Sequence, residues 1–142
     1  MAFNWKDEWA IGNEKIDSQH KELIKTINTL HQACRSGEGF NVIDETMKFL
    51  LDYTVNHFND EETLQRSVGF PDYRNHKEIH EAFKAQAVGF YEKLKSGTSK
   101  NVFLIQMSTA IAEWVVNHVT KEDKKIGEYL KAKSEQSGIP RV

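Results

Sequence analysis

The chain has 142 residues with 19 basic and 21 acidic side chains, and this length predicts a single domain. With 39% hydrophobic and 11% aromatic residues the chain can bury a core, which argues against a disordered tail or a coiled-coil rod. The formal net charge of -2 and the lack of a long basic run argue against nucleic acid and acidic lipid as partners.

Cysteine usage and the first residues indicate the compartment. Cys34 is the only cysteine, so an internal disulfide cannot form, and residues 1–8 lack the apolar segment of a signal peptide. The most apolar runs, such as 102–105, are far shorter than the roughly 20 residues of a membrane-spanning helix. We therefore expect a soluble, cytoplasmic protein that does not insert into membranes.

Apolar residues recur at steps of three and four between three clusters of turn-forming residues, at 36–39, 67–71 and 96–99. This period is typical of helices with one buried face. The predicted helices, in chain order, span about 18–35, 41–66, 72–95 and 100–133, with Ser18 and Asp72 as N-caps of the first and third. Because the connections are short, the expected fold class is all-α, an antiparallel up-down-up-down four-helix bundle.

The remaining residues form the two ends of this single domain, 1–142. Residues 1–17 are expected to be an N-terminal arm outside the bundle of 18–133, and 134–142 a short frayed tail. The arm is predicted to lie ordered on the helices, because it is rich in large apolar side chains: Phe3, Trp5, Trp9, Ile11 and Ile16.

Histidines and carboxylates interrupt the predicted apolar faces. Taken singly, each has an ordinary explanation, as a hydrogen-bonded core histidine or a solvated charge. Their spacing is more informative. His57 and Glu61 are four residues apart, as are His76 and His80, so each pair projects from one face of its helix and can hold a metal ion.

The depth of these residues in the bundle gives an independent test, because antiparallel helices bring residues together only at equal depth. At 1.5 Å per residue, the histidines at 20, 57, 80 and 118 lie roughly 23 to 27 Å from the end that carries the first and third loops. Glu61 and His76 lie about one turn deeper. All four helices therefore contribute a ligand to one layer.

His31 and Cys34 lie outside this layer. His31 points to the same side as His20 but is about 16 Å away along the helix axis, so it is assigned to packing or a hydrogen bond. Cys34 is further away still and is expected to be a small buried apolar residue.

Asp123 follows His118 by five residues and would point about 140° away from it on an ideal α-helix. It can join the layer only if the helix widens locally, as in a one-turn π-bulge. The spacing alone favours the alternative, in which Asp123 belongs to the exposed charged run 121–125.

Five imidazoles and two carboxylates are too many for one four-coordinate zinc, and the absence of thiolates argues against iron–sulfur clusters and cysteine-rich zinc sites. A centre of two metal ions fits the number of ligands. Mixed nitrogen and carboxylate ligands suit iron or manganese, whereas calcium and magnesium prefer oxygen, so iron is the leading choice. If two six-coordinate ions shared both carboxylates and one solvent-derived oxygen, one coordination position would stay open for a small ligand.

The motifs occur in a recognisable order. His20 is followed by HFNDE at 57–61, HKEIH at 76–80 and HVTKED at 118–123, with IDSQHK at 16–21, WVVNH at 114–118 and an N-terminal arm around Trp5. This pattern covers almost the whole chain and closely resembles the hemerythrin family, in particular its single-domain bacterial members. The resemblance implies a four-helix bundle that binds dioxygen at a non-heme di-iron centre with a bridging oxo or hydroxo group.

The resemblance also implies a role for each ligand. One iron would be held by His76, His80 and His118, the second by His20 and His57, and both would be bridged by Glu61 and Asp123. It thus reverses the interpretation of Asp123 from spacing alone. Dioxygen would bind at the second iron, behind walls that exclude water, for which the candidates are Phe58, Trp114, Val115 and Val119.

Three functions are compatible with these features. The first is reversible dioxygen binding by a non-enzymatic carrier, for storage or for delivery to an oxygen-consuming enzyme, which fits the lack of a general acid or base beyond the ligands. The second is a di-iron enzyme that acts on peroxide, nitric oxide or dioxygen. The third is an oxygen sensor that works through a separate partner. A monomer is favoured.

Overall fold

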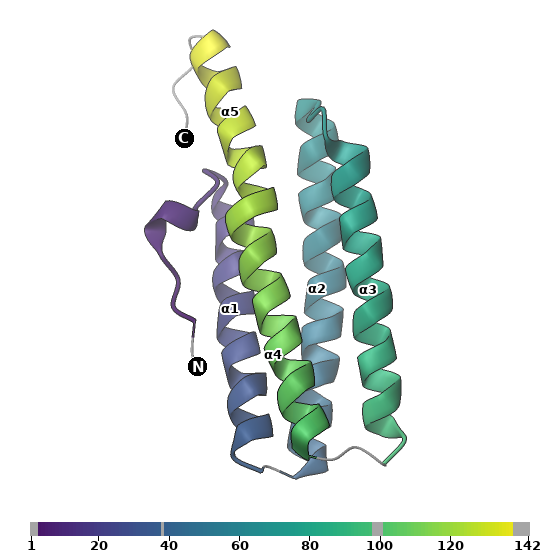
Figure 1. Ribbon diagram of the computed structural model, residues 1–142. Coiled ribbons are helices and arrows are strands. Elements are labelled where there is room, and N and C mark those ends of the chain that lie inside the picture. Colours follow the sequence, from purple (N-terminus) through teal and green to yellow (C-terminus); the bar gives the residue numbers. More distant parts are fainter. Residues whose placement is uncertain (1–2, 38, 98–100, 138–142) are drawn as a thin grey trace.

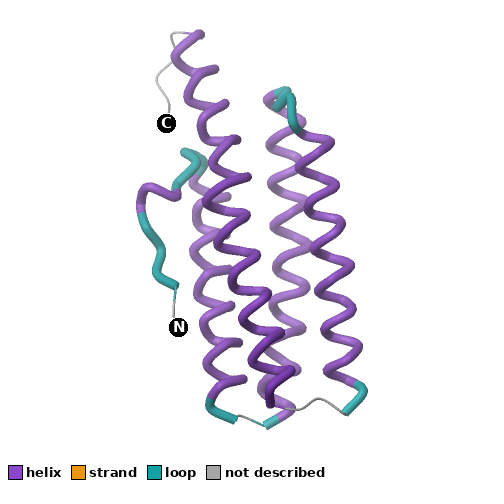
Figure 2. The backbone as a smooth tube through the Cα atoms, viewed as in Figure 1, coloured by secondary structure: helices purple, strands orange, loops and turns teal. Residues whose placement is uncertain are grey.

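The computed structural model describes residues 3–37, 39–97 and 101–137, and most of these are helical (Figure 2). No strand occurs among them, which confirms the all-α class. The helices are η1 (a 3-10 helix, Asp7–Trp9), α1 (Glu14–Arg35), α2 (Phe40–Val68), α3 (Tyr73–Lys95), α4 (Asn101–Asn117), η2 (a π-helix, His118–Asp123) and α5 (Lys124–Ser137).

The helices form an antiparallel four-helix bundle (Figure 1). α1 packs against both α2 and α4, and α2 packs against α3. The fourth helix of the bundle is continuous through α4, η2 and α5, and its C-terminal end extends past the neighbouring helices (Figure 1). The up-down-up-down order predicted from the short connections is confirmed.

The first helix begins earlier than predicted, and Ser18 is not its N-cap. Asn13 holds that position, and its side chain accepts a hydrogen bond from the backbone N–H of Ile16 at 3.1 Å. Asp17, already inside the helix, accepts the backbone N–H of Ile11 at 2.8 Å. The arm therefore ends at Asn13, because the capping amide and the Asp17 carboxylate both turn the chain there.

The other helix boundaries lie close to the predicted ones. α2 ends at Val68 and is capped by Gly69, whose left-handed backbone (φ 69°) closes the helix. The Tyr129 hydroxyl donates to the carbonyl oxygen of Val68 at 2.8 Å. Asp72 occupies the N-cap position of α3, but its side chain makes no capping hydrogen bond. The predicted tail is helical as far as Ser137; residues 138–142, like the predicted start of the fourth helix at 100, lie outside the described residues.

The N-terminal arm is ordered along α1, as predicted (Figure 1). Phe3 and Asn28 form two reciprocal hydrogen bonds, from the Phe3 N–H to Asn28 Oδ1 (2.9 Å) and from Asn28 Nδ2 to the Phe3 carbonyl (2.6 Å). The rings of Trp5 and Trp9 pack edge to face with centroids 5.9 Å apart. Ile11 is fully buried. These contacts fasten the arm at several points along its length.

The apolar core has two parts, with a polar layer between them. The larger cluster fills the bundle from the loop end as far as Phe58 and Val119. A smaller one, at the opposite end, is built from Ile11, Ile16, Phe70 and Ile126. The histidine-rich layer lies between these clusters, so each side of it is closed by apolar side chains.

The fourth helix of the bundle is strongly apolar. By length and composition, Asn101–Glu135 could cross a membrane. Its buried residues include Met107, Ile111 and Val115, which belong to the bundle core. Packing inside the bundle therefore accounts for part of the hydropathy of this segment, whereas Val102 and Ile105 of the same helix are exposed.

Candidate metal centre

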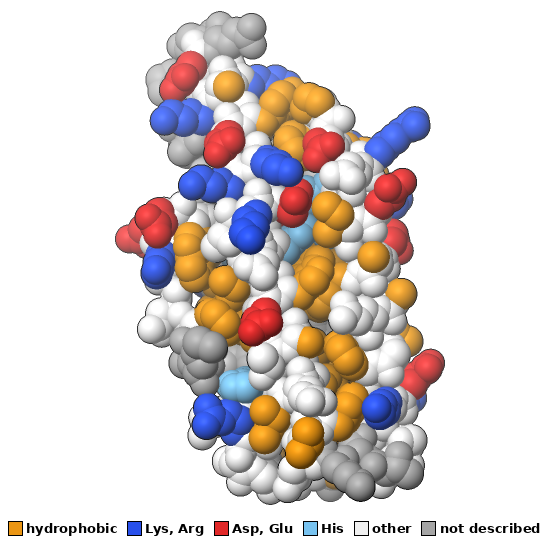
Figure 3. Space-filling model, viewed as in Figure 1, with side chains coloured by type: hydrophobic (Ala, Val, Ile, Leu, Met, Phe, Trp, Pro, Cys, Tyr) orange, Lys and Arg blue, Asp and Glu red, His pale blue; other side chains and the backbone are white. Residues whose placement is uncertain are grey.

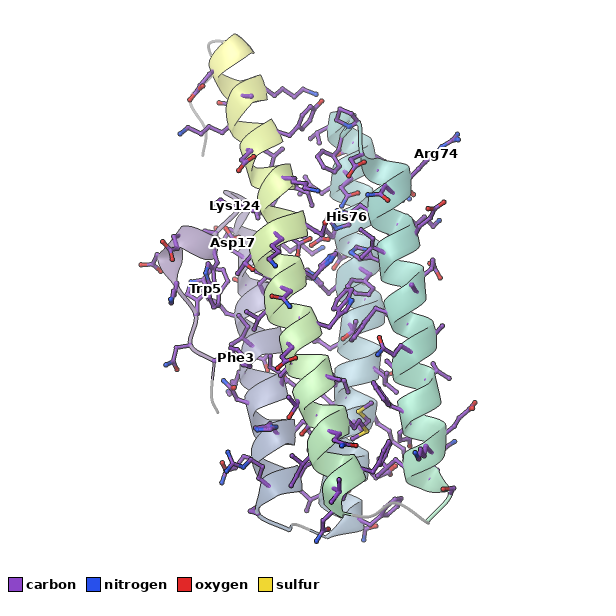
Figure 4. All side chains as sticks on the ribbon, viewed as in Figure 1. Phe3, Trp5, Asp17, Arg74, His76 and Lys124 are labelled. Atoms are coloured by element: carbon purple, nitrogen blue, oxygen red, sulfur yellow. The ribbon has the colours of Figure 1, made fainter. Side chains whose placement is uncertain are left out.

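The structure brings all seven predicted site residues into one buried layer. They come from all four helices of the bundle: His20 from α1, His57 and Glu61 from α2, His76 and His80 from α3, and His118 and Asp123 from the two ends of η2. Figure 4 shows His76 pointing from α3 into the bundle, whereas Arg74 points away from it. Equal depth along antiparallel helices is what allows residues far apart in sequence to meet here.

The seven residues form two overlapping groups of donors. One group contains Glu61 and Asp123 with three histidines, and the other contains the same two carboxylates with two histidines: Glu61, His76, His80, His118 and Asp123, and His20, His57, Glu61 and Asp123. Within each group the donor atoms all lie within 4.8 Å of one another. Two metal ions that share both carboxylates fit this arrangement.

Glu61 divides its two oxygens between the groups. Oε1 lies 2.9 Å from His76 Nε2 and 3.1 Å from His80 Nε2. Oε2 lies 3.2 Å from the Nε2 atoms of both His20 and His57. Each carboxylate oxygen therefore belongs to a different group, as a bridging carboxylate requires.

Asp123 is divided in the same way. Its Oδ1 lies 3.0 Å from His76 Nε2 and 3.1 Å from His118 Nε2, whereas Oδ2 lies 3.0 Å from His20 Nε2. The π-helix η2 makes this possible, because its wider turn brings residue 123 back to the side of residue 118. Asp123 is fully buried, so the exposed position that spacing alone favoured is wrong.

Hydrogen bonds behind two of the rings fix the orientation of their inner nitrogens. His57 Nδ1 donates to Gln19 Oε1 at 2.8 Å, and His80 Nδ1 donates to Glu62 Oε2 at 2.8 Å. Because an amide oxygen and a carboxylate oxygen only accept, each Nδ1 carries a proton, so Nε2 is the nitrogen whose lone pair would face the cluster when a metal ion is bound. Lone pairs of nitrogen and carboxylate oxygen then face one another, an arrangement that a cation stabilises.

The carboxylates also shift the pKa values of the histidines around them. Burial lowers the pKa of His20, but the hydrogen bonds and charges of Asp123 and Glu61 outweigh burial and raise it to about 9. The same balance raises the pKa of His118 to about 9 and that of His76 to about 10. In return, although burial opposes ionisation, the surrounding histidines hold the pKa of Glu61 and of Asp123 well below the usual range.

Aromatic rings cover the histidines on one side. Phe58 stacks on His80 with ring centroids 3.7 Å apart, and Trp114 stacks on His118 at 4.5 Å. Phe83, which lies in the same apolar core, stacks on Trp114 with ring centroids 3.9 Å apart. The other predicted wall residues, Val115 and Val119, are buried in the same core cluster. In the space-filling view, small patches of histidine atoms are visible among hydrophobic, charged and other side chains (Figure 3).

Gln19 and Glu62 are the site residues that sequence reasoning missed. Each is adjacent in sequence to a predicted ligand, His20 and Glu61 respectively, and each supports a histidine on another helix. The general need of a metal-binding histidine for an outer hydrogen-bond partner is the signal that could have found them.

His31 and Cys34 lie outside both groups, as predicted. The Nδ1 atom of His31 lies 2.9 Å from the Ser108 hydroxyl, so this histidine makes a hydrogen bond at a different level of the bundle. Cys34 is buried in the apolar core.

Fold and site together define a class: an antiparallel four-helix bundle with a histidine-rich site that fits two metal ions. A family model described as the hemerythrin HHE cation binding domain matches residues 11–130. A bacteriohemerythrin of Pseudomonas paraeruginosa is 31% identical over 145 residues, covering 96% of this chain and 92% of the relative. A hemerythrin-like protein of Naegleria gruberi is 36% identical over 123 residues, covering 87% and 89%. The crystal structure of a wild-type hemerythrin matches with a TM-score of 0.81 at 28% identity, covering 90% of this chain and 97% of that one.

The chain belongs to the hemerythrin family. Its family and fold imply non-heme di-iron oxygen binding, and the cluster of histidine, glutamate and aspartate fits a di-iron site.

Proposed function

We propose that this protein is a reversible dioxygen carrier or store with a non-heme di-iron centre, and that it is not primarily an enzyme. The observation that carries the proposal is the division of Glu61 and Asp123 between two groups of histidines, with one carboxylate oxygen facing each group. Membership of a family that binds dioxygen supports it.

In this proposal the first iron is held by His76, His80 and His118, and the second by His20 and His57. Glu61 and Asp123 bridge them, with an oxo or hydroxo group as a further bridge. When bound, the two irons supply the two electrons with which dioxygen is held reversibly. Mixed imidazole and carboxylate ligands favour iron or manganese over calcium, magnesium and four-coordinate zinc.

The remaining residues shape the place where dioxygen would bind. The group around His20 and His57 has one histidine fewer than the other, so it is the position with room for an additional ligand. The apolar clusters on both sides of the layer exclude water from it, and the rings of Phe58 and Trp114 cover His80 and His118 of the neighbouring group. Dry surroundings of this kind would slow the loss of the bound gas in reduced form.

A single experiment separates binding from turnover. The purified, iron-loaded protein is reduced without air, exposed to dioxygen, and then stripped of gas while its visible absorption is followed. We expect a band that appears with dioxygen, disappears on stripping and returns over repeated cycles. Rapid irreversible bleaching, or many turnovers of peroxide or nitric oxide, would overturn the carrier in favour of a di-iron enzyme.

A further inference from the structure

Two histidines of the centre have outer hydrogen-bond partners, and they belong to different donor groups. His80, from the three-histidine group, donates from Nδ1 to Glu62; His57, from the two-histidine group, donates from Nδ1 to Gln19. Over the part of the chain that the structure describes, the buried Nδ1 atoms of His20, His76 and His118 have no hydrogen-bond partner. Each group therefore receives one outer hydrogen bond.

The two partners differ in charge. Glu62 is a carboxylate whose side chain is only 6% exposed, so its charge acts on His80 through poorly screened surroundings. Gln19 is a neutral amide, held in place by a hydrogen bond from its Nε2 to Asp60 Oδ2 at 2.7 Å. The Asp60 carboxylate is connected to His57 only through Gln19, whereas Glu62 contacts His80 directly, and Asp60 also faces Lys15 at 3.5 Å.

This difference has a chemical consequence for the ligands. An imidazole that donates to a carboxylate carries more negative charge on its ring, and so its other nitrogen is a stronger donor to a metal ion. An amide oxygen has the same effect to a smaller degree, because it carries only a partial charge. A stronger donor stabilises the more highly charged state of the metal.

We propose that Glu62 and Gln19 add to the difference between the two metal positions, which already differ by one histidine: the outer carboxylate makes the His80 position bind its ion more tightly and favour its oxidised state more than an amide partner, as at His57, would. Glu62 and Gln19 are thus positioning residues that act through histidines. The inference rests on the proposed two-metal centre and goes beyond it, since the ligands alone do not require an outer charge on one side only. It also leaves the more weakly held ion at the position assigned to dioxygen.

Two reciprocal variants test the inference. Glu62→Gln replaces the carboxylate by an amide of equal size whose oxygen can still accept from His80. Gln19→Glu combined with Asp60→Asn places a carboxylate next to His57 Nδ1. The side-chain amide of the new residue at position 60 can then donate a hydrogen bond to that carboxylate. The control is Glu45→Gln, which removes one negative charge from an exposed position on the same helix as Glu62.

The first measurement is a stepwise titration of the metal-free protein with Co²⁺, followed by its absorption spectrum. We expect Glu62→Gln to weaken one of the two binding steps by about 10- to 100-fold and to leave the other unchanged. The Gln19→Glu/Asp60→Asn variant should strengthen the other step, and Glu45→Gln should match the unaltered protein. Equal weakening of both steps, or no difference between Glu62→Gln and Glu45→Gln, would overturn the inference.

The second measurement identifies the position affected. In the Zn²⁺-loaded protein, NMR of the histidine Nδ1–H groups should show the His80 proton shifted by Glu62→Gln and the His57 proton unmoved. In the iron-loaded Glu62→Gln variant, the reduction potential of one iron should rise by about 59 mV for each tenfold loss of preference for the oxidised ion. If the unaltered chain binds fewer than two metal ions, the proposed two-metal centre is wrong. If it binds two ions but Glu62→Gln affects both positions equally, only the inference about Glu62 and Gln19 is wrong.

Discussion

Glu61 and His57 illustrate how much the centre depends on single side chains. Glu61 faces both groups of histidines with its two oxygens, and His57 is one of only two histidines in its group. Removing either leaves buried donors without a partner and one ion short of ligands. We therefore expect His57→Ala and Glu61→Ala to lower the iron content well below two per chain. His31→Ala, at a different level of the bundle, should not do so. Atomic absorption on purified protein checks this, and equal loss in all three variants would contradict the assignment.

Gln65 is a second residue whose environment makes a prediction. It lies one turn beyond Glu61 on α2 and is fully buried, and across the described segments neither of its amide atoms has a hydrogen-bond partner. Burying an unsatisfied polar group costs about 1–3 kcal/mol. Gln65→Met keeps the length of the side chain and removes its polar atoms, so we expect it to raise the free energy of unfolding by about 1–3 kcal/mol.

The control for Gln65→Met is the same substitution at an exposed position of α4, Gln106→Met. Surface changes of this kind usually alter stability by less than about 0.5 kcal/mol. Chemical unfolding of both variants with metal removed isolates the effect of the amide from that of metal binding. A loss of stability in Gln65→Met would show that the amide is satisfied in solution.

At the scale of elements, the contact between the arm and α5 depends on Gly127. A methyl group at Gly127 would lie 3.0 Å from the backbone Cα of Ile11, closer than the two atoms can pack comfortably. Ala is normally favoured over Gly in a helix by about 1 kcal/mol. We expect Gly127→Ala not to gain this stability, because the arm must move away from α5 to make room for the methyl group.

Gly89→Ala provides the matched substitution, since a methyl group there would meet no neighbour within 4 Å. It should stabilise the protein by about 0.5–1 kcal/mol. Thermal unfolding compares the two variants, and the fluorescence of Trp5 and Trp9 reports on the arm. If Gly127→Ala gained as much stability as Gly89→Ala, the close packing of the arm would not hold in solution.

The elements also show why some features could be predicted from the sequence and others could not. The layer of histidines followed from depth along straight helices, a property that spacing determines. Asp123 could not be placed in this way, because a π-helix changes the register within a single turn, and only the resemblance to a family indicated it. The start of α1 was misplaced because Asn13 and Ser18 are both good N-caps, and the choice depends on contacts made by the arm. Gln19 and Glu62 act across helices, which sequence spacing does not describe.

For the whole molecule, the buried charges link folding to pH and to metal. The pKa values of His20 and His118, about 9, and of His76, about 10, lie above the ordinary value of 6.5 because Asp123 and Glu61 overcome the effect of burial. Below about pH 6.5 these histidines are protonated in both the folded and the unfolded chain, so the stabilisation is fully present. As the pH rises, the unfolded chain loses its protons first, and the stabilisation is lost progressively up to about pH 10.

We therefore expect the metal-free protein to unfold at a lower temperature as the pH is raised from about 7 to 9. The protein loaded with Zn²⁺ should not show this loss, because the metal ions take the place of the protons between the same carboxylates and imidazoles, and because a ligand that binds only the folded chain stabilises it. Loading should accordingly release protons, more at pH 7 than at pH 9. Thermal unfolding of both forms across this range, together with proton release measured in weak buffer, checks the linkage. A Tm of the metal-free protein that rose with pH would mean that the histidines do not share protons with Glu61 and Asp123.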